Sequence, residues 1–323
     1  MIKMKKPIFF LLIIVISIIM FSACAREEDN TITIAEQYGL AYAPVQIMKD
    51  KKILEENLVG MKIRWKRLAN TAAIREAVLA GEVDIGFMAI PPFLIGKDKG
   101  MDWKIISGLS MSPLGLMTYK EDLKSLADIG KNDRIALPQP GSVQHILLAM
   151  AAKREFGDTG RFDDQLVTMA HPDGMNALLS RKEITAHFTS PPYLFKESEE
   201  EGIQQIISGE EALGGEFSFI VGVCTEDFYY KYPETYKVFL QSLGQVIEYI
   251  NQNTDEAATI LGESYALSVT ETKKYINWPG MRYTMEIRGL DEFISFMQEA
   301  NYINFENIEL ADILWEVGLY EKQ

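Results

Sequence analysis

Short apolar runs alternate with amphipathic stretches along the chain from residue 31 onward. The stretches between the runs repeat apolar residues at helical spacing, as at Val143, Ile146 and Leu147. This alternation is typical of an α/β protein with mostly parallel sheets. The apolar runs predict β-strands at residues 31–36, 62–68, 83–88, 103–109, 114–119, 134–137, 166–169, 184–189, 203–207 and 217–223.

After residue 223 the pattern becomes almost wholly helical. Phe239, Leu243 and Val246 fall on one face of a helix. Helices are expected at residues 229–251, 255–263, 290–300 and 310–317. The strands are therefore concentrated in the first two-thirds of the chain, and we expect the helical tail to pack back on the first domain.

The N-terminus has the pattern of a lipoprotein signal peptide. Lys3, Lys5 and Lys6 precede an apolar run over residues 7–21, which is shorter than the roughly 20 residues that span a bilayer. The following Phe21-Ser22-Ala23-Cys24 resembles the bacterial lipobox. We therefore predict a signal peptide at 1–23, lipid attachment (palmitate) at Cys24 and a tether over 24–30, which anchor the chain on the extracytoplasmic face of the cell membrane. The alternative is ordinary cleavage beside a chance cysteine.

Two segments one hundred residues apart are similar to each other. Residues 77–94 and 177–194 align without gaps and share five of eighteen residues, including the Pro-Pro pairs at 91–92 and 191–192. Each segment indicates a helix end, a turn, a strand and then Pro-Pro opening the next helix. We interpret this as two equivalent lobes whose helix N-termini face each other across a ligand cleft. The alternative is coincidence between two ordinary βα units.

Several motifs in a fixed order together resemble one protein family. They are Ala41-Tyr42-Ala43-Pro44, Asn70-Thr71-Ala72-Ala73, Ala80-Gly81-Glu82-Val83-Asp84-Ile85-Gly86, Pro91-Pro92, Ser125-Leu126-Ala127-Asp128 and Pro138-Gln139-Pro140-Gly141-Ser142. With the lipobox, they resemble the substrate-binding lipoproteins of ABC importers of the nitrate/sulfonate/taurine and thiamine-precursor type. The similarity covers about residues 31–265, and the last sixty or so residues match only in being helical.

This resemblance implies a type II periplasmic-binding-protein fold, in which two α/β lobes joined by two crossover segments enclose a ligand cleft. The crossovers are expected near residues 112–119 and 217–225. Lobe one would then comprise 31–114 plus 223–323, and lobe two 115–222. The expected partners are a small-molecule ligand and an ABC permease with its ATPase. We expect a monomer without a cofactor or a metal.

Candidate ligand contacts lie where strands end and helices begin, because helix N-termini there point free N–H groups outward. Each such residue is equally well explained as a simple helix cap. The candidates are Gln37, Tyr38, Tyr42, Asn70, Thr71, Ile90, Ser110, Ser142, Gln144, Thr189 and Ser190.

The same loops contain neither Lys nor Arg, which bears on the charge of the ligand. Arg67 is the nearest cation, and a surface salt bridge with a neighbouring carboxylate is its expected role. The composition of the loops favours a neutral, zwitterionic or heteroaromatic solute, such as a pyrimidine or vitamin precursor, stacked on Tyr38 and Tyr42. The alternative is a sulfonate or taurine-like anion held by helix N-termini. Lobe two is expected to supply most of the polar contacts.

Charge and composition make other function classes improbable. The net charge of −14 disfavours nucleic-acid binding. The two cysteines form no disulfide framework, and the three histidines lack metal-ligand spacing. No nucleophile elbow or phosphate-binding loop is present, and we predict no catalytic residues. Two alternatives remain: a receptor that signals to a membrane partner, and a thiamine-pyrimidine-forming enzyme like a catalytic relative of the family.

Overall fold

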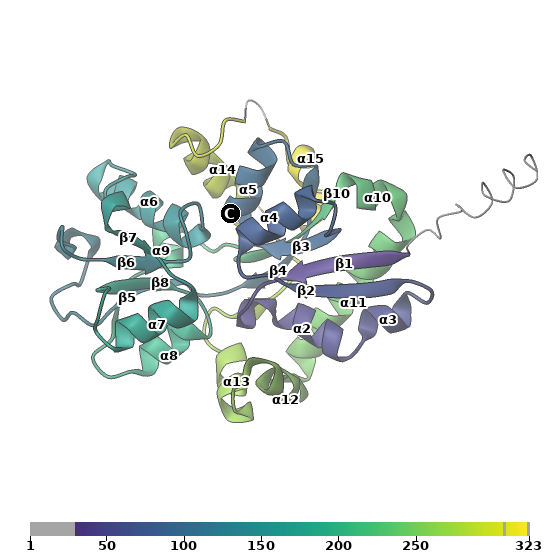
Figure 1. Ribbon diagram of the computed structural model, residues 1–323, viewed down its shortest axis with the longest axis horizontal. Helices are drawn as coiled ribbons and strands as arrows, with labels where there is room; N and C mark the ends of the chain where they lie inside the picture. Colours follow the sequence, from purple (N-terminus) through teal and green to yellow (C-terminus); the bar gives the residue numbers. More distant parts are fainter. Residues whose placement is uncertain (1–29, 306–307, 322–323) are drawn as a thin grey trace, which may run out of the picture.

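Two β-sheets organise the chain in the computed structural model, which describes residues 30–305 and 308–321 (Figure 1). The expected signal peptide, Cys24 and the tether up to residue 29 lie outside the described residues. We call each sheet with its covering helices a lobe: lobe one contains the six-stranded sheet and lobe two the five-stranded sheet. The lobe boundaries expected from the sequence stay a prediction.

The sheet of lobe one has the strand order β11-β4-β10-β3-β1-β2. Strand β1 pairs in parallel with β2 on one side and β3 on the other, whereas β10 runs antiparallel between β3 and β4. The strands are β1 (Thr31–Glu36), β2 (Lys62–Arg67), β3 (Ile85–Met88), β4 (Trp103–Met111), β10 (Ile220–Thr225) and β11 (Arg282–Tyr283). The two-residue β11 was not anticipated, because so short a strand leaves no periodicity.

The sheet of lobe two, ordered β7-β6-β8-β5-β9, repeats the same plan. Strand β6 pairs in parallel with β7 and β8, and β5 runs antiparallel between β8 and β9. The strands are β5 (Gly115–Thr118), β6 (Ile135–Leu137), β7 (Leu166–Thr168), β8 (Ala186–Thr189) and β9 (Gln204–Ser208). The segments 77–94 and 177–194 contain β3 and β8, which occupy equivalent places, so the internal similarity reflects a repeated fold.

The expectation of mostly parallel sheets is wrong, since among the described residues four strand pairs are parallel and five are antiparallel. The antiparallel strands β5 and β10 follow the two passages of the chain between the lobes, at 112–114 and 214–219. A strand buried on both faces is apolar throughout in either direction. The apolar runs therefore located these strands without showing their direction.

Helices cover both faces of each sheet (Figure 1). The two Pro-Pro pairs differ: α5 begins at Ile90, before Pro91, whereas α8 begins at Tyr193, after Pro192. In the described part of the chain, no helix has both the length and the apolar character needed to cross a membrane. The α-helices are α2 (Ala43–Asp50), α3 (Ile53–Asn57), α4 (Thr71–Leu79), α5 (Ile90–Asp98), α6 (Val143–Phe156), α7 (His171–Leu179), α8 (Tyr193–Glu199), α9 (Gly209–Leu213), α10 (Glu226–Lys231), α11 (Pro233–Gln252), α12 (Thr254–Tyr265), α13 (Val269–Ile276), α14 (Leu290–Glu299) and α15 (Leu310–Ile313).

The C-terminal helices contact both lobes, and not the first alone as expected. Helix α12 packs on α2 of lobe one. Beyond α13, the ring of Trp278 stacks on Phe195 of α8 in lobe two, with 4.4 Å between ring centroids. Lys153 of α6 forms a salt bridge with Glu299 of α14. This segment therefore bridges the lobes as well as completing the first.

Gly108 lies where β4 closely approaches the C-terminal segment. Its N–H donates to the carbonyl oxygen of Met285 at 2.8 Å. A Cβ atom at position 108 would lie 2.0 Å from the carbonyl oxygen of Glu286, which is far inside van der Waals contact. Only glycine allows the segment to lie this close.

We expect Gly108→Ala to lower the free energy of unfolding by about 1–3 kcal/mol, the usual cost of overpacking. Gly318→Ala is the matched control, because a Cβ at that position meets no atom within 4 Å. Urea unfolding of both variants measures the difference. Equal stability of the two variants would contradict the close approach.

Candidate functional site

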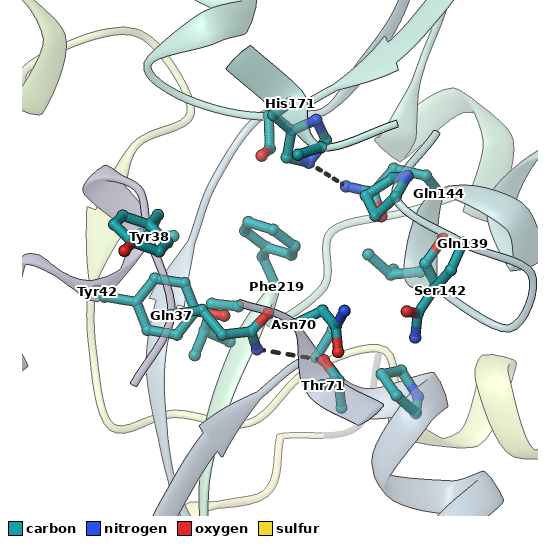
Figure 2. Close-up of a pocket in the computed structure, with 18 of the residues that line it drawn as sticks. Gln37, Tyr38, Tyr42, Asn70, Thr71, Gln139, Ser142, Gln144, His171 and Phe219 are labelled. Atoms are coloured by element: carbon teal, nitrogen blue, oxygen red, sulfur yellow. Dashed lines mark hydrogen bonds between the residues drawn. The ribbon is translucent and has the colours of Figure 1, made fainter. Parts of the chain in front are cut away.

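A cavity of about 290 Å³ lies between the lobes and is lined by residues of both (Figure 2). Its walls are the segments that follow the carboxyl ends of parallel strands, where ligands bind in open α/β sheets. Gln37, Asn70 and Ala89 follow strands of lobe one, and Pro138 and Ala170 follow strands of lobe two. The sheet topology therefore brings segments distant in the sequence to one place.

Helix starts form much of this wall. Asn70 caps α4 by accepting a hydrogen bond from the Ala73 N–H at 3.0 Å, and Ser142 caps α6 by accepting one from the His145 N–H at 3.3 Å. The first residues of α7 also line the cavity. Helix N-termini carry partial positive charge and free N–H groups. They give the cavity hydrogen-bond donors without any charged side chain.

Most of the ligand contacts predicted from the sequence line this cavity, but that they bind a ligand stays a prediction. Those that line it are Gln37, Tyr38, Tyr42, Asn70, Thr71, Ser142, Gln144 and Ser190.

Three predicted residues do not line the cavity. Strand β4 extends to Met111, so Ser110 lies within the sheet, opposite Ile220 and Tyr283. Ile90 and Thr189 are completely buried. Strand β4 ends two residues later than expected and α5 begins one residue earlier, whereas Thr189 ends its strand as expected and is excluded by burial alone.

Sequence reasoning missed four further cavity residues with chemically useful side chains, Gln139, His171, Tyr193 and Phe219. The omission of His171 was avoidable, because it follows the predicted strand at 166–169. The rule applied to the other parallel strands would have identified it. Phe219 is the last residue of the second passage between the lobes, and only the fold places it here.

In lobe one, an amide and aromatic rings form the wall. The Gln37 amide donates to the Thr71 hydroxyl at 3.2 Å and to the Phe87 carbonyl oxygen at 3.4 Å (Figure 2). Tyr38 is 61% exposed, whereas Tyr42 is buried. Burial and the nearby Glu36 raise the pKa of Tyr42, so its hydroxyl stays protonated.

An ion pair lies just outside this wall. Arg67 donates two hydrogen bonds to one oxygen of Glu36, at 3.1 and 3.2 Å, and one to the side chain of Gln46. The expected salt bridge of Arg67 is present, but its partner Glu36 is buried, so the pair does not lie at the surface as expected. Burial raises the pKa of Glu36, while Arg67 acts in the opposite direction. The pair joins the ends of β1 and β2, and neither residue lines the cavity.

In lobe two, four side chains form a hydrogen-bonded series from the cavity into the interior. Gln144 Nε2 lies 3.2 Å from His171 Nε2 (Figure 2). His171 Nδ1 in turn lies 3.2 Å from His187 Nε2. His187 Nδ1 then lies 2.7 Å from an oxygen of Glu197. His187 and Glu197 are completely buried. We call this series the relay.

Burial disfavours the charged forms of the relay. It lowers the pKa of His187 and raises that of Glu197. Burial and the neighbouring His187 hold the pKa of His171 well below its usual value. Together with the rest of the lining, in which no Lys, Arg, Asp or Glu occurs among the described residues, this makes the cavity neutral.

The described residues contain no group of three or more His, Cys, Asp or Glu side chains arranged to hold a metal ion. Cys224 is buried, and burial raises the pKa of its thiol. A buried thiol of high pKa is unreactive.

Comparison with solved structures identifies the fold. The chain is similar to the alkanesulfonate-binding protein SsuA from Xanthomonas axonopodis pv. citri (TM-score 0.73, 16% identity, 91% of this chain and 99% of that one). It is similar to the aliphatic sulphonate-binding SsuA from Escherichia coli (TM-score 0.70, 17% identity, 88% and 92% coverage). The nitrate-binding NrtA from Synechocystis gives a TM-score of 0.72 at 13% identity, with 90% and 87% coverage. The expected periplasmic-binding-protein fold is confirmed.

At the level of sequence, the profile of the NMT1-like family matches residues 25–262. This confirms the family resemblance read from the motifs. No curated protein matches the chain significantly.

We expect Arg67→Met to lower the free energy of unfolding by about 1.5–3 kcal/mol, because it leaves the buried Glu36 without its charged partner. Without Arg67 the pKa of Glu36 rises further, so the folded variant binds more protons than the unfolded chain. The difference in free energy of unfolding between the wild type and the variant therefore becomes smaller as the pH falls below neutrality and larger as the pH rises.

The matched control is Lys66→Met. Lys66 is on the same strand as Arg67, and its salt bridge with Glu82 is more exposed. We expect a much smaller loss there, because exposed ion pairs contribute little. Urea unfolding at two pH values measures both variants. A deficit in Arg67→Met that does not change with pH would contradict the role given to Glu36.

Proposed function

The chain belongs to the NMT1-like family, and from this membership and the form of its cavity we propose that it is the solute-binding lipoprotein of an ABC importer. It captures a small organic solute outside the cytoplasm and delivers it to a membrane permease that works with an ATPase. The observation that carries the proposal is a cavity built from helix starts of two lobes. Solved structures of the same fold named as sulfonate- or nitrate-binding proteins support the same role.

The neutrality of the cavity indicates the class of solute. Its walls combine the amides and hydroxyls described above with the rings of Tyr42, Tyr193 and Phe219. A volume of about 290 Å³ lies just below the usual range for ligand pockets, roughly 300–1,000 Å³, and so favours a small solute. An uncharged, flat solute of one or two rings, such as a pyrimidine or vitamin precursor, matches these walls. A sulfonate would find helix N-termini but no cationic side chain.

In the proposed mechanism of capture, the two lobes close about the segments 112–114 and 214–219 and bury the solute between them. Rigid-body closure about a few hinge residues is a common response of two-lobed proteins to a ligand. Solute that contacts both lobes stabilises the closed form, and that form is the one that the permease recognises. The protein itself performs no chemistry on the solute.

We expect an uncharged heteroaromatic compound, and neither nitrate nor an alkanesulfonate, to raise the melting temperature in a thermal-shift screen of pyrimidines, flavins, taurine, sulfonates and nitrate. A ligand at one hundred times its dissociation constant stabilises the fold by about 2.7 kcal/mol. Tighter binding of a sulfonate than of every uncharged ring would contradict the solute class but not the role in import.

Once the screen has identified a compound that binds, two helix-cap residues provide a matched pair of variants to test where it binds. Asn70 caps α4 at the cavity, and Thr225 caps α10 away from it. Alanine at either position costs about 1 kcal/mol of stability. By calorimetry, only Asn70→Ala should also weaken binding, by up to about tenfold for one lost hydrogen bond.

The lipid anchor gives an independent test of localisation. We expect Cys24→Ser to abolish incorporation of a palmitate analogue and to release the protein from the membrane fraction or leave it unprocessed. Cys224→Ser is the control, since Cys224 is the only other cysteine of the chain and is buried. Normal processing and membrane retention of Cys24→Ser would rule out lipid attachment at this residue.

A further inference from the structure

The hydrogen bonds of the relay can run in only two directions, toward the interior or toward the cavity. Each ring nitrogen of His171 and His187 has a single partner in the series, and a neutral imidazole carries one donor and one acceptor nitrogen. If Glu197 accepts a proton from His187, every donor points inward and Gln144 donates to His171. If Glu197 donates to His187, every donor points toward the cavity and the carbonyl oxygen of Gln144 accepts from His171. Rotating the side-chain amide of Gln144 by half a turn exchanges its oxygen and its NH₂ group, which occupy nearly the same space.

The second oxygen of Glu197 decides between these directions. This oxygen, Oε2, is buried and has no hydrogen-bond partner among the described residues. An ionised carboxylate in such a place would be a buried charge with a single hydrogen bond, which is costly. A proton on Oε2 would be a buried donor without an acceptor, which folded proteins rarely contain. A carboxylic acid protonated on Oε1 avoids both costs, because it donates to His187 and leaves only a carbonyl oxygen unpaired.

We propose that Glu197 is a carboxylic acid whose proton directs the relay toward the cavity, so that Gln144 presents its N–H groups to the solute and the site selects ligands bearing a hydrogen-bond acceptor. Glu197 is then a positioning residue that acts on the solute through two histidines and a glutamine. The proposal deepens the solute-binding function and rests on it for the selection of ligands, but not for the direction of the relay.

The packing of α7 against β8 keeps the relay intact. A Cβ atom at Gly174 would lie 2.6 Å from Nε2 of His187, the nitrogen that contacts His171. Only glycine at this point of α7 lets the two rings meet. Stacking of His171 on Tyr193, with ring centroids 5.9 Å apart, holds the His171 ring at the cavity wall.

The direction of the relay has a consequence for specificity. With its carbonyl oxygen engaged by His171, Gln144 offers the cavity only N–H donors. A carbonyl oxygen or a ring nitrogen of the solute satisfies them, whereas a group that only donates leaves them unpaired. A buried polar group left unpaired costs more than the hydrogen bond itself contributes. The site therefore discriminates between rings of similar size and shape by whether they carry a hydrogen-bond acceptor.

Spectroscopy of the solute-free, full-length protein tests the direction of the relay. We expect an infrared difference spectrum between the wild type and Glu197→Gln to contain the carbonyl stretch of a carboxylic acid at neutral pH. The protein has only three histidines, so ¹⁵N NMR of histidine-labelled protein resolves each ring after assignment with single variants. We expect His171 and His187 both to carry their proton on Nε2. A carboxylate band, or protons on Nδ1 of both rings, would overturn the proposal.

Two substitutions separate positioning from mere packing. Glu197→Gln keeps a donor in place of the acid and should leave the ¹⁵N shifts of both histidines close to those of the wild type. Glu197→Met fills similar space without a donor and should change the shifts of His187 and, through it, of His171. A purely structural Glu197 would leave His171 unchanged in both variants, and that result would overturn the proposal. Gly174→Ala should likewise uncouple His171 from Glu197.

A pair of flat, uncharged probes tests the selection of ligands. Pyrazine carries only acceptor nitrogens, whereas pyrrole carries only a donor. By ligand-observed NMR we expect the wild type to bind pyrazine several-fold more tightly than pyrrole, and Gln144→Glu, which presents acceptor oxygens instead, to reverse this order. Equal binding, a preference for pyrrole or no binding of pyrazine to the wild type would overturn the acceptor selectivity. Because the spectra above are recorded without solute, failure of the solute-binding function remains distinguishable from failure of the relay.

Discussion

The insertion of one antiparallel strand into each sheet is the constraint on which the rest of the structure depends. Strand β10 lies between β3 and β4 in lobe one, and β5 lies between β8 and β9 in lobe two. Each inserted strand belongs to the part of the chain that crosses between the lobes, so the backbone hydrogen bonds of both sheets hold the two passages in place. With the passages fixed, the carboxyl ends of the parallel strands face one cavity (Figure 2). The pairing of the two inserted strands therefore also fixes where the cavity lies.

The ionisable side chains near this cavity are either paired with an opposite charge or buried in a way that disfavours their charged forms. Arg67 and Glu36 neutralise each other behind the wall of lobe one, and the histidines and Glu197 of lobe two are neutral because burial disfavours their charged forms. What remains for a solute is a set of amides, hydroxyls, rings and helix N-termini. Such a site recognises shape and the direction of hydrogen bonds rather than charge.

The C-terminal helices add a constraint on motion. They pack on lobe one, yet Trp278 stacks on Phe195 and Glu299 pairs with Lys153, both of lobe two. Closure and opening of the lobes must either break these contacts or carry part of the C-terminal segment with lobe two. Phe195 is completely buried, so breaking its contact exposes apolar surface to water. These contacts favour the arrangement of the lobes seen here.

The sequence by itself determined the positions of ten strands, the repeated plan of the lobes and eight residues of the cavity wall. It did so because apolar runs of strand length and cap residues such as Asn70 and Ser142 are local signals. Only the tertiary structure decided the direction of β5 and β10, since a fully buried strand has the same composition in either direction. It also decided the meeting of Gln144, His171, His187 and Glu197, which come from four different elements. Their chemistry depends on burial, on a close approach at Gly174 and on which nitrogen faces which oxygen, and none of these is a property of neighbouring residues in the chain.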